Sequence, residues 1–406
     1  MSLQIALSGL NAASNQLDVT ANNIANAETT GFKLSRASFS DVFSSTNASA
    51  SSPGGLGGVQ VGGMSQKFTQ GNLEYTDDAL DLAINGDGFF TLQSSEGMVF
   101  SRAGEFTVDS DGFVVNQQNQ KLQSFPVGAN GQFSTGRLED LKVDNALSAP
   151  KASELAEVQV SLPGDAAVPA VADFDPTLPA SYNHATSMTV YDSLGASHTA
   201  SLYFAKSPDA NNTWVQHLFV DGEQLGDANE LVFDELGSLQ TPADGRFSYP
   251  DLAIDGGAAP MALTFDFNGS QQFGSDFSVS RLSQDGFESG QLTGLTVGQD
   301  GVVSARYSNR QNVALGKVAI TQFANPSNLQ QLGSTTWAAS AGSGEPRMGE
   351  SGTSNFGLIQ SGALEGSNVD ITEQLVQMIT AQRNFQANAK SLSTSDSITQ
   401  EILNIR

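Results

Sequence analysis

The stretch ITEQLVQMITAQRNFQANAKSL, residues 371–392, decides how the C-terminal part of this chain folds. Its apolar and small residues recur at alternating spacings of four and three, a period of 3.5 residues that is typical of coiled coils. No glycine or proline interrupts residues 371–406, and Asp370 with Glu373 forms a capping box. The pattern predicts one long amphipathic helix. Its repeat positions are Ile371, Leu375, Met378, Gln382, Phe385, Ala389 and Leu392, and the repeat resumes at Ile402.

The first residues of the chain carry the same spacing. The repeat comprises Leu3, Leu7, Leu10, Leu17 and Ile24, with Ser14 and Ala21 in the remaining positions. We expect a helix that ends near Gly31, and we expect residues 1–30 to pair with residues 364–406 as a coiled coil. Pairing within one chain and pairing between chains both fit the pattern. An ordinary amphipathic helix on a globular core is the alternative, but the length of the second helix argues against it.

Composition excludes several classes of function. The net charge is −25, from 43 acidic and 18 basic residues, whereas nucleic-acid binding needs basic patches that neutralise phosphate. There is no cysteine, so disulfides and thiolate metal sites are excluded. We expect no membrane insertion, because no apolar run approaches the roughly 18 residues of a spanning helix. The N-terminus also lacks the basic and apolar regions of a cleavable signal peptide.

The middle of the chain has the pattern of short strands. Residues 31–69 are rich in serine and glycine, which predicts a flexible or irregular connector. From about residue 70 to residue 360, short alternating runs are separated by Asp-Gly and Asn-Gly pairs, the turn signals of β-hairpins. HTASLYF (198–204) and WVQHLFV (214–220) read as strands. We therefore expect mainly-β middle domains, in barrel or sandwich form.

One internal similarity suggests how this β region divides. TVDSDGFV (107–114) and TVGQDGVV (296–303) share the pattern T-V-x-x-D-G-x-V. If the two hairpins are related, residues 70–145 with residues 285–363 form a discontinuous β domain, and residues 146–284 form an outer β domain inserted into it. A chance similarity of two turns is the alternative.

No residue pattern predicts catalysis, a metal site or a cofactor. His184, His198 and His217 are the only histidines, and their spacing is not that of metal ligands. VDSDGF (108–113) resembles part of a calcium loop but lacks its first aspartate and its last glutamate. Acidic residues are too abundant for any pair of carboxylates to indicate glycoside chemistry. The sequence therefore favours a protein that is not an enzyme.

Four segments resemble, in order, the rod and hook family of bacterial flagellar axial proteins. They are ANNIANAETTGFK (21–33), LAINGDGFF (82–90), SRAGEFTVDSDGFVVN (101–116) and the C-terminal segment from residue 367 to residue 404. The family's signature residues are matched by Asn22, Asn23, Asn26, Gly31, Phe32 and Lys33, and in the second segment by Gly86, Gly88, Phe89 and Phe90.

Within this family the middle of the chain resembles hook members, which carry an inserted domain similar to residues 189–206 and 212–222. Residues 283–309 and 323–333 also look like hook members, although Arg310 stands where those often have glycine. The resemblance implies a helical homopolymer, a curved flexible tube that transmits motor torque to the filament as a universal joint. It implies that the terminal helices bury their stripes between subunits around an export channel, with polar side chains facing that channel.

The resemblance also implies partners and a location. The partners would be further copies of this chain, the distal rod, the hook cap, the hook–filament junction proteins and the flagellar type III export apparatus. The location would be the extracellular hook of the flagellum, reached without a cleavable signal peptide. Two alternatives remain: a distal rod protein, which would form a straight drive shaft with similar ends, and a secreted β-rich enzyme.

Overall fold

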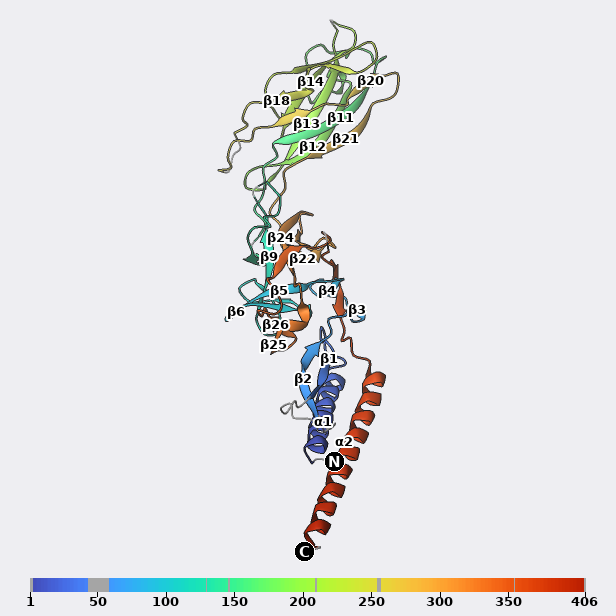
Figure 1. Ribbon diagram of the computed structural model, residues 1–406. Coiled ribbons are helices and arrows are strands. Elements are labelled where there is room, and N and C mark those ends of the chain that lie inside the picture. The colour runs from blue at the N-terminus through green and yellow to red at the C-terminus, as the bar shows by residue number, and fades with distance from the viewer. Residues whose placement is uncertain are drawn as a thin grey trace. The chain divides into compact units, whose positions relative to one another are not determined.

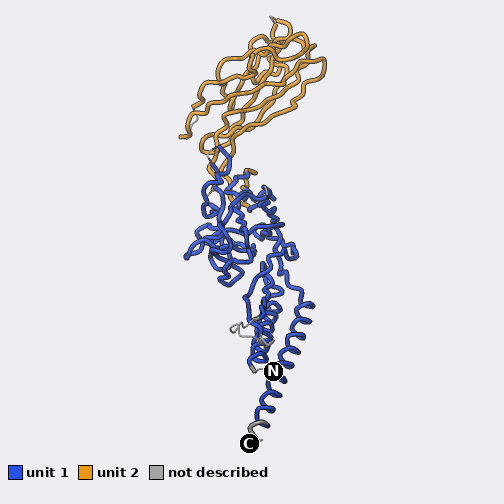
Figure 2. The backbone as a smooth tube through the Cα atoms, viewed as in Figure 1, with its two compact units in different colours: residues 1–145, 294–306, 312–406 blue, residues 146–293, 307–311 orange. Residues whose placement is uncertain are grey.

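The computed structural model describes residues 3–42, 58–128, 130–144, 147–208, 210–253, 257–353 and 355–404. The chain divides into two compact units (Figure 2). Unit 1 comprises residues 1–145, 294–306 and 312–406, and unit 2 comprises residues 146–293 and 307–311. The predicted class, a mainly-β protein of several domains with a helix at each end, is confirmed.

The two helices belong to unit 1. Helix α1 spans Leu3–Ala25, helix α2 spans Ile371–Asn404, and the two lie side by side (Figure 1). The carboxylate of Asp370 caps α2, because it accepts hydrogen bonds from the backbone N–H groups of Thr372 and Glu373 at 2.8 and 3.1 Å. The expected end of α1 near Gly31 is wrong. The helix ends at Ala25, and hydrogen-bonded turns continue the chain towards Gly31, which has a φ of 69°.

A two-stranded ladder follows α1. Strand β1 (Ser35–Val42) pairs antiparallel with strand β2 (Gly58–Gln66), with a register shift between Ser38 and Phe39. The prediction of an irregular connector is therefore wrong for these two strands, and residues 43–57 of that connector lie outside the described residues. The physical reason is that an antiparallel ladder is held by backbone hydrogen bonds, which serine and glycine can make without packing side chains.

The main sheet of unit 1 has 12 strands, in the order β22-β23-β24-β9-β5-β6-β26-β25 with four strands beside this path. Its strands are β5 (Phe89–Ser94), β6 (Gly97–Ser101), β7 (Thr107–Val108), β8 (Val114–Val115), β9 (Lys121–Pro126), β10 (Glu139–Asp140), β22 (Leu292–Val297), β23 (Val302–Tyr307), β24 (Asn312–Gln322), β25 (Gln330–Gly333), β26 (Thr336–Ala338) and β27 (Arg347–Glu350). A 3₁₀ helix, η2 (Pro326–Asn328), precedes β25. Two small ladders complete the unit: β3 (Leu73–Tyr75) pairs with β29 (Ala363–Glu365), and β4 (Leu82–Asn85) pairs with β28 (Leu358–Ser361).

The two hairpins of similar sequence both belong to the 12-stranded sheet. They are β7–β8, which turns at Gly112, and β22–β23, which turns at Gly301. Both glycines have the positive φ that an Asp-Gly turn requires, 87° and 82°. The hairpin prediction is wrong for two other pairs, Asp244-Gly245 and Asn268-Gly269. The strands on either side of Asp244-Gly245 pair elsewhere, and those around Asn268-Gly269 both pair in parallel with β11 (Leu155–Pro163).

Unit 2 contains two sheets that share one core. The five-stranded sheet consists of β11, β18 (Arg246–Ser248), β19 (Thr264–Asp266), β20 (Gln271–Phe273) and β21 (Ser278–Gln284). The six-stranded sheet consists of β12 (His184–Tyr191), β13 (Ser197–Lys206), β14 (Thr213–Val220), β15 (Glu223–Gln224), β16 (Asn229–Phe233) and β17 (Leu239–Thr241). A 3₁₀ helix, η1 (Pro179–Ser181), precedes β12. The strands expected at 198–204 and 214–220 are confirmed as β13 and β14.

Side-chain alternation explains why unit 2 closes into a sandwich. Strand β11 alternates buried and half-buried residues along its whole length, so one face meets the core. The buried cluster contains side chains of both sheets, among them Val158, Leu202 and Phe265. The indole of Trp214 donates a 3.1 Å hydrogen bond to Gln272 of the other sheet. Neither helix of the described chain is long and apolar enough to span a membrane.

Candidate functional site

The helices meet through small and polar side chains. Helix α1 buries Ala6, Ala13, Thr20 and Asn23. Helix α2 buries Gln374 and Ala381. A Cβ atom added at Gly9 would lie 2.9 Å from the side chain of Asn388, so the helices approach closely at that level. The contact within one chain is therefore a close packing of small residues, with a hydrogen bond of 3.1 Å from Asn23 to Gln374.

The predicted apolar stripes, by contrast, are only partly covered in a single chain. Leu7, Ile371 and Leu375 are each 45–46% exposed. Leu10, Leu17, Ile24, Met378, Phe385 and Leu392 are half-buried. The side chains of Leu3 and Ile402 lie outside the described residues. Because successive helical residues differ by about 100°, the buried positions Ala6 and Ala13 lie on a face adjacent to the leucines, not on the leucine face itself.

The asparagines of the N-terminal motif have different environments. Asn22 is exposed, and Asn26 is half-buried, with its amide bonded to the carbonyl of Asn22. Asn23 is only 1% exposed. Its side chain forms two hydrogen bonds with the backbone of Ser35 in β1, at 2.8 and 2.9 Å, besides the one to Gln374. Asn23 therefore connects α1 to β1 and α2.

The end of the motif is buried against the rest of unit 1. Gly31, Phe32 and Lys33 are all buried. Gly31 combines a positive φ with a close contact, because a Cβ atom there would lie 2.4 Å from the backbone nitrogen of Ala103. Its N–H donates a 2.7 Å hydrogen bond to the carbonyl of Glu365. Only glycine fits this position, where the first segment of the chain meets one of the last.

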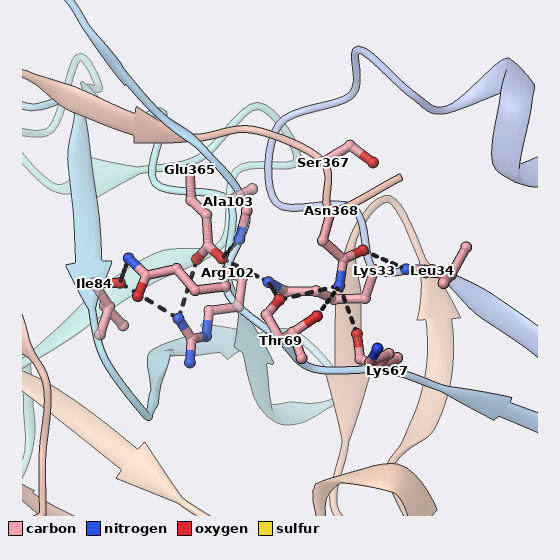
Figure 3. Close-up of polar contacts among 12 residues, drawn as sticks. Lys33, Leu34, Lys67, Thr69, Ile84, Arg102, Ala103, Glu365, Ser367 and Asn368 are labelled. Atoms are coloured by element: carbon pink, nitrogen blue, oxygen red, sulfur yellow. Dashed lines mark hydrogen bonds and ion pairs between the residues drawn. The ribbon is translucent and has the colours of Figure 1, made fainter. Parts of the chain in front are cut away.

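Four residues form what we call the polar junction: Lys33, Arg102, Glu365 and Asn368 (Figure 3). The ammonium of Lys33 donates to Oε1 of Glu365 at 2.6 Å, and the guanidinium of Arg102 donates to Oε2 of the same carboxylate at 3.1 Å. The exposed fractions of these side chains are 0%, 3% and 0% for Lys33, Arg102 and Glu365. One buried carboxylate thus pairs with two buried cations.

Backbone carbonyls supply further acceptors to both cations. Lys33 also donates to the carbonyl of Thr69 at 2.9 Å. Arg102 donates through Nη2 to the carbonyl of Gly86 at 2.9 Å, and through Nη1 to that of Ile84 at 3.4 Å. The N–H of Gly71 donates to Oε1 of Glu365 at 2.9 Å. The cations and the carboxylate therefore keep several partners each, which offsets the cost of removing them from water.

Asn368 forms the second half of the polar junction. Its amide oxygen accepts a hydrogen bond from the N–H of Leu34 at 2.7 Å. Its amide nitrogen donates to the carbonyls of Lys67 and Thr69 at 2.8 and 3.0 Å. The residue that precedes α2 is thereby fixed to the segments that precede β1 and follow β2.

Burial dominates the electrostatics of Lys33. Desolvation lowers the pKa of its ammonium group below the ordinary value of 10.5, the carboxylate of Glu365 opposes this change, and the nearby Arg102 adds to it. The Nε atom of Arg102 is buried without a hydrogen-bond partner among the described residues. Burying the charges of the polar junction therefore costs desolvation free energy. Removing one of the charged partners should destabilise the protein.

The second motif lies beside the polar junction. The carbonyl of Gly86 accepts from Arg102, and Gly88 has a φ of 137° in a place where a Cβ atom would lie 2.3 Å from the side chain of Ile320. Phe89 belongs to an aromatic cluster with Phe100 and Trp337. Phe90 is completely buried, with its ring centroid 5.4 Å from that of Phe106. These residues build the core under the junction.

Comparisons with known proteins match almost the whole chain. The matching family models are "Flagella basal body rod protein" over residues 3–33, "Flagellar hook protein FlgE/F/G D1 domain" over 83–168, "Flagellar basal body protein FlaE D2 domain" over 161–287 and "Flagellar basal body rod FlgEFG protein C-terminal" over 360–405. The flagellar hook protein FlgE of Salmonella typhimurium is 38% identical over 415 residues, with 100% of both chains covered. This chain belongs to the flagellar hook protein family. The resemblance expected from its motifs is confirmed.

Other hook proteins are similar over comparable lengths. FlgE of Escherichia coli K12 is 38% identical over 412 residues, covering 100% of both chains. FlgE of Borreliella burgdorferi is 32% identical over 439 residues, covering 100% of this chain and 99% of its own. The crystal structure of Helicobacter pylori hook protein FlgE2 shares the fold, with a TM-score of 0.54 at 14% identity; the match covers 72% of this chain and all of that one.

The histidines of this hook-family chain have structural surroundings. His217 stacks on Phe174 at 3.8 Å, His184 stacks on Phe277 at 4.5 Å, and burial lowers the pKa of both imidazoles. His198 bonds the carboxylate of Asp221 at 2.6 Å. Within the described part of the chain, no three histidine or acidic side chains are grouped as metal ligands.

Sequence reasoning missed three members of the polar junction: Arg102, Glu365 and Asn368. Arg102 lies in the family segment of residues 101–116. Glu365 and Asn368 lie just before the C-terminal helix. For Glu365 the available signal was a single charge inside the otherwise uncharged segment ALEGSN (363–368). Such isolated charges are candidates for buried pairs, but the sequence does not say which residues pair.

Proposed function

We propose that this chain is the structural subunit of the bacterial flagellar hook, which assembles from many copies into a curved, flexible tube. The tube transmits torque from the motor to the filament as a universal joint and encloses an export channel. The observation that carries this proposal is the similarity to hook proteins over the full length of the chain. The partly exposed apolar stripes of α1 and α2 support it, because a polymerising subunit needs apolar side chains that remain accessible to its neighbours.

The terminal helices are the assembly elements in this proposal. Their stripes, which include Leu7 and Leu375, pack as coiled coils against the helices of neighbouring subunits. Asn11, Asn15 and Asn22 are exposed on α1 and would line the channel. An uncharged polar lining allows unfolded subunits to pass without adhering. Replacing these three asparagines with leucine should reduce export, and unchanged export would contradict this role.

The polar junction couples the helices to the β-structure of the same unit. It holds the segment after α1 and the segment before α2 to strand β4 and to Arg102, which follows β6, through buried, charge-assisted hydrogen bonds, which are stronger than neutral ones. Torque applied to the helices would therefore reach the β-structure without a soft linker.

The inserted residues 146–284 carry the outer contacts in this proposal, within the domain division expected from the sequence. Contacts between neighbours must change as the tube bends, and small wet interfaces exchange more easily than large dry ones. A subunit without residues 146–284 should still polymerise, into a tube that is straighter or mechanically altered.

The proposed partners are further copies of this chain, the distal rod, the hook cap, the hook–filament junction proteins and the flagellar type III export apparatus. The proposed location is the extracellular hook, reached without a cleavable signal peptide. The role is mechanical and not enzymatic. A distal rod protein is the nearer alternative, and the full-length match to hook proteins favours the hook.

Electron microscopy of the purified, polymerised chain tests this function. Curved or supercoiled tubes with a central channel are the expected result. Rigid straight rods would favour the distal rod alternative. A protein that remains monomeric under all polymerising conditions, and that fails to restore hooks in cells lacking their own hook protein, would contradict both.

A further inference from the structure

The N-terminal segments of unit 1 are completed by residues near the C-terminus. Strand β3 pairs with β29, and strand β4 pairs with β28, each in a two-stranded sheet of its own. The N–H groups of Gly31 and Leu34 bond to the carbonyl of Glu365 and the side chain of Asn368. Residues 31–34 and 73–85 therefore find these partners only when residues 358–368 are in place.

The same C-terminal segment supplies the missing charge. Lys33 and Arg102 are both buried, and both are paired with Glu365, which lies 332 and 263 residues away in sequence. Burying a cation without its counter-charge is strongly unfavourable. Until Glu365 is in place, the side chains of Lys33 and Arg102 are therefore more stable in water than buried. The core that they cover then cannot form.

Unit 2 is arranged in the opposite way. Strand β11 pairs with β19, β20 and β21, and all four strands lie between residues 155 and 284. The buried residues of its core lie between Ala156 and Phe267. This sandwich therefore needs no strand and no charged side chain from residues 358–374.

We infer that residues 358–374 act as a C-terminal latch, which keeps unit 1 open until the end of the chain is present. The latch combines the strands β28 and β29, the carboxylate of Glu365, the amide of Asn368 and the side chain of Gln374, which bonds Asn23 of α1. It closes the ladders and the polar junction in one step. Unit 2 folds before this step and independently of it.

The consequence concerns incomplete chains. A chain that emerges N-terminus first, and that lacks its last residues, has a folded unit 2 but no closed unit 1. Helix α1 then lacks its contact with α2 and the hydrogen bond from Asn23 to Gln374. This consequence for polymerisation rests on the proposed function, whereas the latch itself is a property of folding and is tested without any polymer.

Pulse-labelled hydrogen exchange during refolding of the full-length, wild-type chain tests the latch. Amides of residues 73–85 and 358–365 should become protected together, in a later step than amides of residues 197–220 in unit 2. Protection of residues 73–85 before residues 358–365, or together with unit 2, would overturn the inference. Neither result depends on whether the chain later forms tubes.

A matched pair of variants sharpens the test. Glu365→Gln removes the carboxylate of the latch, and should increase exchange of folded residues 73–85 by about a hundredfold or more, because two buried cations lose their counter-charge. Glu350→Gln is the control, because Glu350 pairs with Lys317 at 2.6 Å in the same unit but lies outside the latch. Unit 2 should exchange as in the wild-type chain in both variants. Equal effects of the two substitutions on residues 73–85 would overturn the role of Glu365.

Discussion

The ammonium group of Lys33 lies 2.6 Å from the carboxylate of Glu365, and neither side chain is exposed to solvent. The pair connects the segment after the first helix with the segment before the last one. Because Arg102 shares the same carboxylate, the three side chains behave as one unit and not as two independent ion pairs.

The shared carboxylate predicts unequal effects of removing its partners. Lys33→Met should lower the free energy of unfolding of unit 1 by about 1–3 kcal/mol, since Glu365 keeps Arg102 and the N–H of Gly71. Glu365→Gln should lower it by about 3–5 kcal/mol, since it leaves two buried cations. Urea unfolding followed by the fluorescence of Trp337, in a Trp214→Phe background, measures both. A larger loss for Lys33→Met would contradict the shared role of Glu365.

Asn22 and Asn23 provide a second, closely matched comparison. Asn23→Ala removes the side-chain partner of the part-buried backbone N–H and C=O of Ser35 and should destabilise the contact of α1 with β1 by about 1–3 kcal/mol. Asn22→Ala changes an exposed helical residue and should be neutral or slightly stabilising. Hydrogen exchange of residues 16–25 in the full chain measures the difference. Equal exchange in the two variants would show that Asn23 does not anchor the helix.

The sequence predicted what depends on local pattern. The 3.5-residue period identified both helices, and alternation identified strands β13 and β14. It did not predict the β1–β2 ladder, which has few apolar residues to produce a pattern, nor the end of α1 at Ala25. Pairings such as Lys33 with Glu365 join residues far apart in sequence, so no local signal specifies them. The sequence predicted that the two helices pair but not the face through which they meet, because Ala13, Thr20 and Asn23 are not hydrophobic enough to appear as a stripe.

Arg310 lies between strands β23 and β24, and its backbone has a φ of 65°. Because a side chain is strained in this region and glycine is not, Arg310→Gly should stabilise unit 2 by up to about 1 kcal/mol. Asn119→Gly is the control, since Asn119 has a φ of 57° and asparagine tolerates it. Thermal unfolding measures both. A destabilised Arg310→Gly chain would indicate that the arginine side chain makes a compensating contact.

Tyr249 predicts a pH dependence of unit 2. Burial raises the pKa of its phenol from 10 to about 12, while its hydroxyl donates a hydrogen bond to Gln216. A raised pKa in the folded state means that this stabilisation is fully present below pH 10, and is lost as the pH rises towards about 12. The full loss corresponds to about 3 kcal/mol. Urea unfolding followed by Trp214 in a Trp337→Phe background should show this decline, and Tyr249→Phe should remove it. The same decline in the phenylalanine variant would assign it to another group.

The measurement that tests the central claim most directly is polymerisation of a chain whose stripes have been made polar. In the Leu7→Asn/Leu375→Asn double variant both altered side chains are about half exposed in a single chain, so both units should unfold in urea as in the wild type. Leu236→Asn is the control, because Leu236 is 81% exposed in unit 2 and lies outside the helices. By electron microscopy and sedimentation, the control should form tubes like those of the wild type and the double variant should remain monomeric. Normal tubes from the folded double variant would contradict the claim that the open stripes of α1 and α2 build the polymer.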